Sequence, residues 1–251
     1  MAVKRAALVT GASYGVGAAT ARALARDGFD VAVTATRIEN LADTVKMLEP
    51  LGVRVVPAEL DLRNETNIAR TAADVIAALG GLDLLVNNAG VNLRKLAAEV
   101  SGEEWDVVMA VNVRGTFFLT QQVGRHLIAT GRGGCIVSIA STHALVGAPE
   151  RSTYGISKAA LVGMTRMLAV EWAAHGIRVN AIAPGRLDTP SPSRAGKGAD
   201  RDYMEAMLKR IPLRRQASAD EVAEAVAYFA SPAAASITGQ VLVLDGGLTA
   251  V

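Results

Sequence analysis

The fold of this chain is decided by the segment AALVTGASYGVG, which spans residues 6–17. Residues 6–10 form a short, almost continuous apolar run, typical of a parallel strand that helices cover on both faces. Gly11, Gly15 and Gly17 then mark the turn into an amphipathic segment. Such glycines allow a pyrophosphate to approach the backbone at the positive end of the following helix. The spacing G-x-x-x-G-x-G differs from the common G-x-G-x-x-G, so an ordinary strand–helix turn is the alternative to a dinucleotide site.

Apolar runs and amphipathic segments alternate along the rest of the chain. The further apolar runs are Val31–Ala35, Val53–Ala58, Leu82–Val86, Ile136–Ala140, Arg178–Ala183 and Val241–Leu244. The amphipathic segments are Val16–Arg26, Ile38–Leu48, Thr66–Leu79 and Glu103–Ala129. Two helix starts match the capping box, Ser101 with Glu104 and Ser218 with Glu221. Alternation over all 251 residues predicts an α/β fold with a doubly wound, Rossmann-like parallel sheet in a single domain, residues 1–251.

One irregular stretch interrupts this pattern. Residues 185–202 are rich in Pro, Ser, Arg and Gly and follow the sixth predicted strand. Their position puts them at the carboxyl edge of the sheet, where open α/β folds bind ligands. Long loops inside a domain are usually functional, often as lids, or else disordered. We predict a substrate lid over residues 185–211, in which residues 185–202 are mobile without ligands and order over the bound substrate and nicotinamide.

Composition excludes several classes of function. A formal net charge of +2 is too small to indicate a nucleic-acid or membrane-surface binder. The N-terminal apolar run Ala6–Val9 is too short for the core of a signal peptide, and no stretch has the apolar length that spans a bilayer. The single cysteine, Cys135, reads as a buried strand thiol in a reducing compartment. We expect a cytoplasmic protein with no nucleic-acid or membrane partner.

A tyrosine and a lysine stand four residues apart in a segment, residues 152–173, that reads as a helix. Tyr154 and Lys158 therefore share one helix face. A phenol is a poor base at neutral pH because its pKa is near 10, and a nearby ammonium group favours the phenolate. The pair is a weak signal alone, because a chance Tyr-x-x-x-Lys arises easily in a chain of this composition.

Other polar residues follow the predicted strands in a fixed order. Asp61 ends the third strand region, where a carboxylate can accept from an adenine amino group, and Asn87–Gly90 ends the fourth. Ser141 lies just past the fifth strand, and Asn112 lies inside the long helical segment before it. Taken singly, the serine reads as a turn residue or cap and the asparagine as a solvent contact.

Together these motifs resemble the short-chain dehydrogenases/reductases, and the resemblance covers essentially the whole chain. It rests on Thr10–Gly17, Asp61, Asn87–Gly90, Asn112, Ser141, Tyr154, Lys158, and Pro184-Gly185 after Arg178-Val179-Asn180. The resemblance implies that Tyr154 is the general acid/base and that Ser141 orients the substrate oxygen. It also implies that Lys158 binds the nicotinamide ribose and lowers the Tyr154 pKa, and that Asn112 holds a water in the proton relay.

The same resemblance implies a nicotinamide cofactor and no metal. The histidines His126, His143 and His175 show no ligand spacing. The expected cofactor contacts are Gly11, Ser13, Tyr14, Gly15, Val16, Gly17, Thr36, Arg37, Asp61, Leu62, Asn88, Ala89, Gly90, Tyr154, Lys158, Pro184, Gly185, Leu187 and Thr189. Among these, Leu187 and Thr189 match positions that contact the carboxamide.

The end of the second strand favours NADP(H), with NAD(H) as the alternative. An NAD-preferring member usually carries a carboxylate there for the ribose 2′-hydroxyl, and this chain has none before Glu39. Thr36 and Arg37 stand there instead, and a guanidinium suits a 2′-phosphate. Against this, many NADP-using relatives carry Arg or Lys where this chain has Tyr14.

The sequence leaves the substrate open. Residues 33–37 are similar to the 3-oxoacyl-(acyl-carrier-protein) reductases, which favours a thioester or general carbonyl reductase. Residues 87–96 and 171–176 look more like sugar-acid or polyol dehydrogenases such as gluconate 5-dehydrogenase. Arg94, His143, Arg151 and Arg186 are candidates for contact with an anionic substrate.

Two further expectations concern the class of protein and its assembly. A dinucleotide-binding regulator without catalysis is the alternative from another class, and the complete set of Asn112, Ser141, Tyr154 and Lys158 argues against it. Resemblance to relatives that pair long helices and C-terminal strands predicts a homotetramer acting on a small carbonyl or alcohol substrate.

Overall fold

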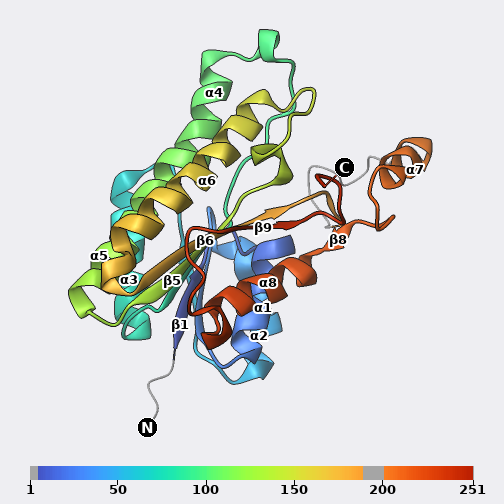
Figure 1. Cartoon of the computed structure of the whole chain (residues 1–251). Helices are drawn as coiled ribbons and strands as arrows, with labels where there is room; N and C mark the ends of the chain where they lie inside the picture. Colours follow the sequence, from blue (N-terminus) through green and yellow to red (C-terminus); the bar gives the residue numbers. More distant parts are fainter. Residues whose placement is uncertain (1–4, 189–200, 251) are drawn as a thin grey trace.

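Seven parallel strands form one sheet in the computed structural model, which describes residues 5–188 and 201–250 (Figure 1). Their order is β3-β2-β1-β4-β5-β6-β9. The strands are β1 (Ala6–Val9), β2 (Asp30–Ala35), β3 (Val55–Glu59), β4 (Leu84–Asn87), β5 (Gly134–Ile139), β6 (Ile177–Pro184) and β9 (Val241–Leu244). Each predicted apolar run forms a strand of this sheet, which confirms the doubly wound α/β prediction.

Helices cover both faces of the sheet (Figure 1). One layer holds α1 (Gly15–Arg26), α2 (Ala42–Leu48) and α8 (Ala219–Ala230). The other holds α3 (Glu65–Leu79), α4 (Gly102–Met109), α5 (Thr116–Thr130) and α6 (Ser152–Trp172), while α7 (Arg201–Lys209) stands apart from both layers. The short 3₁₀ turns are Ile38–Leu41, Glu49–Leu51, Ala97–Glu99, Thr142–Ala144, Ala173–His175 and Pro232–Ala234.

Alternate side chains of the strands enter two separate cores. Val9 of β1 packs in the core that contains Leu24 of α1 and Val226 of α8. Its neighbour Leu8 points the other way, into the core that contains Leu119 of α5. Burial on both faces is the physical reason why these strands read as continuous apolar runs rather than as alternating ones. The cores fix the sheet on which the site is built.

The order of the strands reverses between β1 and β4, which lie side by side in the sheet. Such a reversal opens a crevice at the carboxyl ends of the two strands, and open α/β sheets bind ligands there. β1 runs into the glycine-rich turn of residues 10–17, and β4 runs into residues 88–90. The topology therefore brings together the two sequence motifs that indicated a dinucleotide.

The long helix expected over Glu103–Ala129 is interrupted by a π-helical turn. This turn, Ala110–Gly115, lies between α4 and α5. A Cβ on Gly115 would lie 1.9 Å from the carbonyl oxygen of Leu62, so the helix passes in close contact with the segment after β3. Single π turns inside α-helices often occur at functional sites. Here the turn carries Asn112, whose side chain is buried.

Several smaller features complete the description. The predicted capping boxes at Ser101 and Ser218 are both formed. Strands β7 (Leu187–Asp188) and β8 (Ala217–Ser218) form an additional parallel pair that the sequence did not indicate. Thr189 and residues 189–200 of the predicted lid lie outside the described residues. Within the described part of the chain, no helix combines the length and apolar character that a membrane crossing needs.

Candidate active site

Three glycines shape the turn between β1 and α1. Gly11 and Gly15 have φ angles of +63° and +60°, in the left-handed region that favours glycine. Gly17 lies inside α1, and a Cβ there would be 2.3 Å from the carbonyl oxygen of Gly11. Tyr14 is the N-cap residue of α1, and its side chain makes no capping hydrogen bond. The turn thus leaves its backbone open at the positive end of a helix, which fits a pyrophosphate.

Thr10 joins this turn to the loop after β4. Its Oγ1 accepts hydrogen bonds from the backbone N–H groups of Asn88 and Ala89, both at 3.0 Å. In return, the Asn88 side-chain amide donates to the carbonyl oxygens of Thr10 and Gly11, both at 2.9 Å. Thr10 was not predicted from the sequence to be a positioning residue. The signal that could have identified it is its position directly after β1 and before the first glycine.

The cofactor residues predicted after β2 and β3 lie at the same edge of the sheet. Thr36 and Arg37 directly follow β2 and are exposed, and Glu39 comes only two residues later. Leu62 is buried in the core beneath α3 and α5. The strand end therefore presents a guanidinium rather than a carboxylate, as the sequence indicated.

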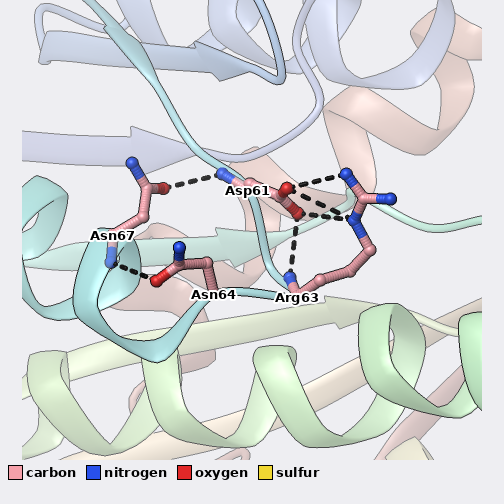
Figure 2. Close-up of polar contacts among 4 residues, drawn as sticks. All are labelled: Asp61, Arg63, Asn64 and Asn67. Carbon is pink, nitrogen blue, oxygen red and sulfur yellow. Dashed lines mark hydrogen bonds and ion pairs between the residues drawn. The ribbon is translucent and has the colours of Figure 1, made fainter.

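Asp61 belongs to a bonded turn after β3 (Figure 2). Its carboxylate accepts from the guanidinium of Arg63, at 2.9 Å and 3.2 Å from Nε and at 2.8 Å from Nη2, and from the Arg63 backbone N–H at 2.9 Å. This contact holds the pKa of the Asp61 carboxyl below its usual value. Asn67 Oδ1 accepts from the Asp61 N–H at 2.7 Å, and Asn64 caps α3. An adenine amino group would have to share the carboxylate with Arg63.

Asn112 is a buried positioning residue in this structure. Its Oδ1 accepts from the Val91 N–H at 2.8 Å, and its Nδ2 donates to the Val91 carbonyl at 2.9 Å and to Ser157 Oγ at 3.0 Å. The Ser157 hydroxyl in turn donates to the carbonyl of Tyr154 at 2.7 Å. The π turn, the loop after β4 and the start of α6 are therefore held together through one amide. The expected role of Asn112 in holding a water stays a prediction.

Lys158 is buried beneath the loop after β4. Its Nζ donates to the carbonyl oxygen of Ile139 at 2.8 Å and lies 5.7 Å from the centre of the Tyr154 ring. Removal from water disfavours the ammonium form and lowers the pKa of Lys158 to about 8. A Cβ on Gly90 would lie 3.5 Å from this Nζ and 3.1 Å from Asn112 Oδ1. The glycine keeps space for a ligand hydroxyl beside the lysine.

Tyr154 and Ser141 face each other across the ends of α6 and β5. Burial raises the pKa of Tyr154, while the hydrogen bond with the Ser141 side chain and the charge of Arg151 both oppose that rise. The sequence analysis expected Lys158 to lower this pKa. The structure does not confirm that, because burial raises the pKa of Tyr154 and the groups that oppose the rise are Ser141 and Arg151. The His143 N–H donates to Ser141 Oγ at 3.2 Å, which holds the serine in place.

Two adjoining cavities meet at Tyr154 and Ser141. The smaller, about 200 Å³, has Gly90, Lys158 and Pro184 in its wall, on the side of the glycine turn. The larger, about 680 Å³, is lined by the predicted substrate residues Arg94, His143, Arg151 and Arg186. Gly185 and Leu187 line both cavities. The four predicted substrate residues therefore lie in the wall of one cavity. Arg210 lines the same cavity and was not predicted from the sequence.

This fold and site define a Rossmann-like protein with a cradle for a dinucleotide and a buried tyrosine–lysine pair beside it. A family model described as Enoyl-(Acyl carrier protein) reductase matches residues 11–249. The chain is 38% identical to the 3-oxoacyl-[acyl-carrier-protein] reductase of Thermotoga maritima, over 96% of each chain. It is 35% identical to the gluconate 5-dehydrogenase of Gluconobacter oxydans, over 97% of this chain and 94% of the relative.

A solved structure agrees with these sequence comparisons. The acetoin dehydrogenase of Salmonella typhimurium superposes with a TM-score of 0.90 at 35% identity, over 99% of this chain and 97% of that one. The chain belongs to the short-chain dehydrogenase/reductase family. It is an NAD(P)-dependent oxidoreductase that acts on carbonyl or alcohol groups, which confirms the class of activity expected from the sequence.

Proposed function

We propose that Tyr154 is the general acid/base of this oxidoreductase. The observation that carries the proposal is the convergence of Tyr154, Ser141 and Lys158 where the two cavities meet. Because burial raises the pKa of Tyr154, the phenol is protonated at neutral pH and can donate a proton to a carbonyl that is being reduced. Ser141 holds the substrate oxygen beside the phenol, and Lys158 Nζ reaches the ribose next to Gly90.

The residues of the site fit a nicotinamide dinucleotide. The turn at Gly11–Gly17 receives the pyrophosphate, and Gly90 leaves room beside Lys158 for the ribose. When bound, the nicotinamide supplies or accepts the hydride. The chain itself supplies the proton at Tyr154 Oη, the orientation at Ser141 Oγ, and the framework that Asn112 holds together. A regulator that only binds the dinucleotide does not need a tyrosine and a serine side by side in the cavity wall. The presence of Tyr154 and Ser141 there therefore argues against a regulator without catalysis.

The substrate candidates stay those of the sequence analysis. A 3-oxoacyl-thioester or general carbonyl reductase is supported by the Thermotoga maritima relative. A sugar-acid or polyol dehydrogenase is supported by the relative named gluconate 5-dehydrogenase. A further relative, 39% identical to this chain, is named cis-4-hydroxycyclohexanecarboxylate dehydrogenase. A panel of carbonyl compounds, polyols and hydroxy acids, read by NAD(P)H absorbance, tests the proposal. Absence of turnover across the panel with both cofactors would contradict it.

We further propose that NADP(H) is preferred to NAD(H). Arg37 is exposed at the end of β2, where no carboxylate precedes Glu39. The solved structure of a relative from Agrobacterium tumefaciens, 37% identical to this chain, holds bound NADP. The guanidinium of Arg37 would make a charge-assisted contact to the 2′-phosphate.

Arg37→Ala should therefore weaken NADPH binding about ten- to a hundredfold and leave NADH binding nearly unchanged. The loss corresponds to roughly 1.4–3 kcal/mol for one charge-assisted hydrogen bond. Fluorescence titration of both cofactors measures it, with exposed Arg70→Ala on α3 as the matched control. Equal losses for the two cofactors, or a wild-type protein that prefers NADH, would be inconsistent with this assignment.

We propose a homotetramer. Two apolar surfaces are exposed in the single chain. One includes Trp105 and Phe117 of α4 and α5, and the other includes Met167 and Val170 of α6, which are 68% and 82% exposed. Exposed apolar patches of this kind often mark interfaces. Light scattering at micromolar concentration should give about four times the chain mass of 26.0 kDa. A monomer mass would refute the proposal.

A further inference from the structure

The larger cavity has a strongly cationic wall. Among the described residues that line it, four are arginines, Arg94, Arg151, Arg186 and Arg210, and a single one, Glu150, is acidic. Glu150 accepts from Arg94 Nε at 2.5 Å, so this carboxylate offsets one guanidinium at the rim. A protein with a formal net charge of only +2 thus concentrates positive charge beside its reacting tyrosine. Such a wall favours a negatively charged ligand.

The arginines occupy different places around the cavity. Arg151 donates to Asn92 Oδ1 at 2.7 Å, and its charge acts on both Tyr154 and His143. It therefore lies next to the reacting groups. Arg186 directly follows Gly185, which lines both cavities, and Arg210 comes just after α7. These two arginines therefore come from the segments after β6 and α7, whereas Arg151 directly precedes α6.

A polar group in the same wall also lacks a protein partner. His143 Nδ1 is buried and makes no hydrogen bond within the described residues. Burial and the charge of Arg151 lower the pKa of His143, so the imidazole is neutral at pH 7. A neutral ring nitrogen suits a hydroxyl group of the ligand, and an unsatisfied buried polar atom costs free energy until it finds a partner. The wall therefore offers contacts for a charged group and for a hydroxyl.

We propose that the substrate is a small hydroxy or keto acid, with its carboxylate at Arg186 and Arg210 and its reacting oxygen at Tyr154 and Ser141. A guanidinium binds a carboxylate through two parallel hydrogen bonds, which also fixes its orientation. The cavity volume of about 680 Å³ lies within the range of small-ligand sites. This inference rests on the proposed function, because it names the substrate class of the same site.

Matched substrate pairs test the charge directly. Gluconate and 3-hydroxybutyrate are compared with their neutral partners glucitol and 1,3-butanediol, by kcat/KM in the oxidation direction. The acids should be preferred at least tenfold. Arg210→Gln and Arg186→Gln should each reduce that preference about ten- to a hundredfold, the usual effect of one charge-assisted contact. Arg210 is exposed, so its variant is expected to fold even if Arg186→Gln does not.

Lys209→Gln is the matched control. It removes the same charge one residue away, and its Nζ pairs with Glu205 at 2.8 Å rather than lining the cavity. The preference should not change in this variant. Equal use of acids and neutral partners, an unchanged preference in both arginine variants, or better turnover of glucitol 6-phosphate than of the acids would overturn the inference.

A second readout does not depend on turnover. With NADP⁺ present, gluconate or 3-hydroxybutyrate should raise the melting temperature of the wild-type protein, and the neutral partners should not. If no acid either reacts or raises the melting temperature, the inference fails. If neutral alcohols react through Tyr154 as well as the acids do, the inference fails while the proposed function stands.

Discussion

Tyr154→Phe should lower turnover at least a hundredfold in both directions. Reduction of a carbonyl builds negative charge on its oxygen, and in the proposed mechanism the phenol of Tyr154, beside Ser141, neutralises that charge. The substitution keeps the ring and its packing and deletes only the hydroxyl. Proton transfer by a positioned side chain contributes about 10²–10⁴ in rate. Steady-state kinetics on the best substrate measures the loss.

Further readouts separate this role from a structural one. The free energy of unfolding and the cofactor affinity of Tyr154→Phe should stay near the wild-type values. Ser141→Ala should lower turnover without changing cofactor affinity, because the role proposed for Ser141 is to hold the substrate oxygen and not the cofactor. In the wild type, oxidation should become faster as pH rises, since burial keeps the phenol protonated at neutral pH and the reaction needs the phenolate. Arg151→Gln should move this ionisation to higher pH, because the Arg151 charge opposes the rise of the pKa. More than about a tenth of wild-type turnover in Tyr154→Phe would rule out general acid catalysis by this residue.

The sequence predicted the sheet well because the signal is local. Strands β1, β2, β4, β5 and β6 are buried between the two layers of helices, so their residues are mostly apolar, and this pattern can be read from each short segment by itself. The capping boxes at Ser101 and Ser218 are also local, since each needs only a hydroxyl and a carboxylate three residues apart. The glycine turn was readable for the same reason, and its positive φ angles at Gly11 and Gly15 require glycine.

The features that sequence reasoning missed depend on contacts between distant segments. The π turn at Ala110–Gly115 depends on the approach of Leu62, about fifty residues earlier in the chain. The contact between Asp61 and Arg63 is local by contrast, and it depends on the conformation of the turn after β3 rather than on apolar character. Arg210 lines the larger cavity only because the fold places the end of α7 beside that cavity. Apolar periodicity carries no signal for any of these arrangements.

The expected effect of Lys158 on Tyr154 shows the same limit. Helical spacing placed the two residues on one face, and the pair gained its meaning from the other motifs of the chain. It could not show that Lys158 Nζ donates to the Ile139 carbonyl or that the ammonium is fully removed from water. Both facts are properties of the folded core. Removal from water makes the lysine a costly group to bury, the hydrogen bond offsets part of that cost, and the remainder is expected to be visible in stability.

Lys158→Met should abolish turnover and at the same time stabilise the cofactor-free protein. Activity falls more than in Tyr154→Phe, because the variant also loses the proposed contact to the ribose and binds the cofactor more weakly. Stability rises because the fold holds the pKa of Lys158 at about 8, against an ordinary value of 10.5. That difference corresponds to roughly 3 kcal/mol of cost at neutral pH. The variant also loses the hydrogen bond from Lys158 to the Ile139 carbonyl, which destabilises the protein by about 1–2 kcal/mol. The net increase in the free energy of unfolding is then about 1–2 kcal/mol.

The pH dependence distinguishes this explanation from improved packing by methionine. The unfolded chain binds a proton at Lys158 that the folded chain releases above about pH 8, so the cost of burial is present in full below that value and shrinks as pH rises toward 10.5. Urea unfolding of the cofactor-free proteins should therefore show the advantage of Lys158→Met at pH 7 and a smaller advantage at pH 9.5. Exposed Lys46→Met is the matched control and should change neither stability nor turnover. An advantage that is equal at both pH values would mean that the buried ammonium is not its cause, and a loss of stability at pH 7 would mean that the core depends on the lysine for more than its charge.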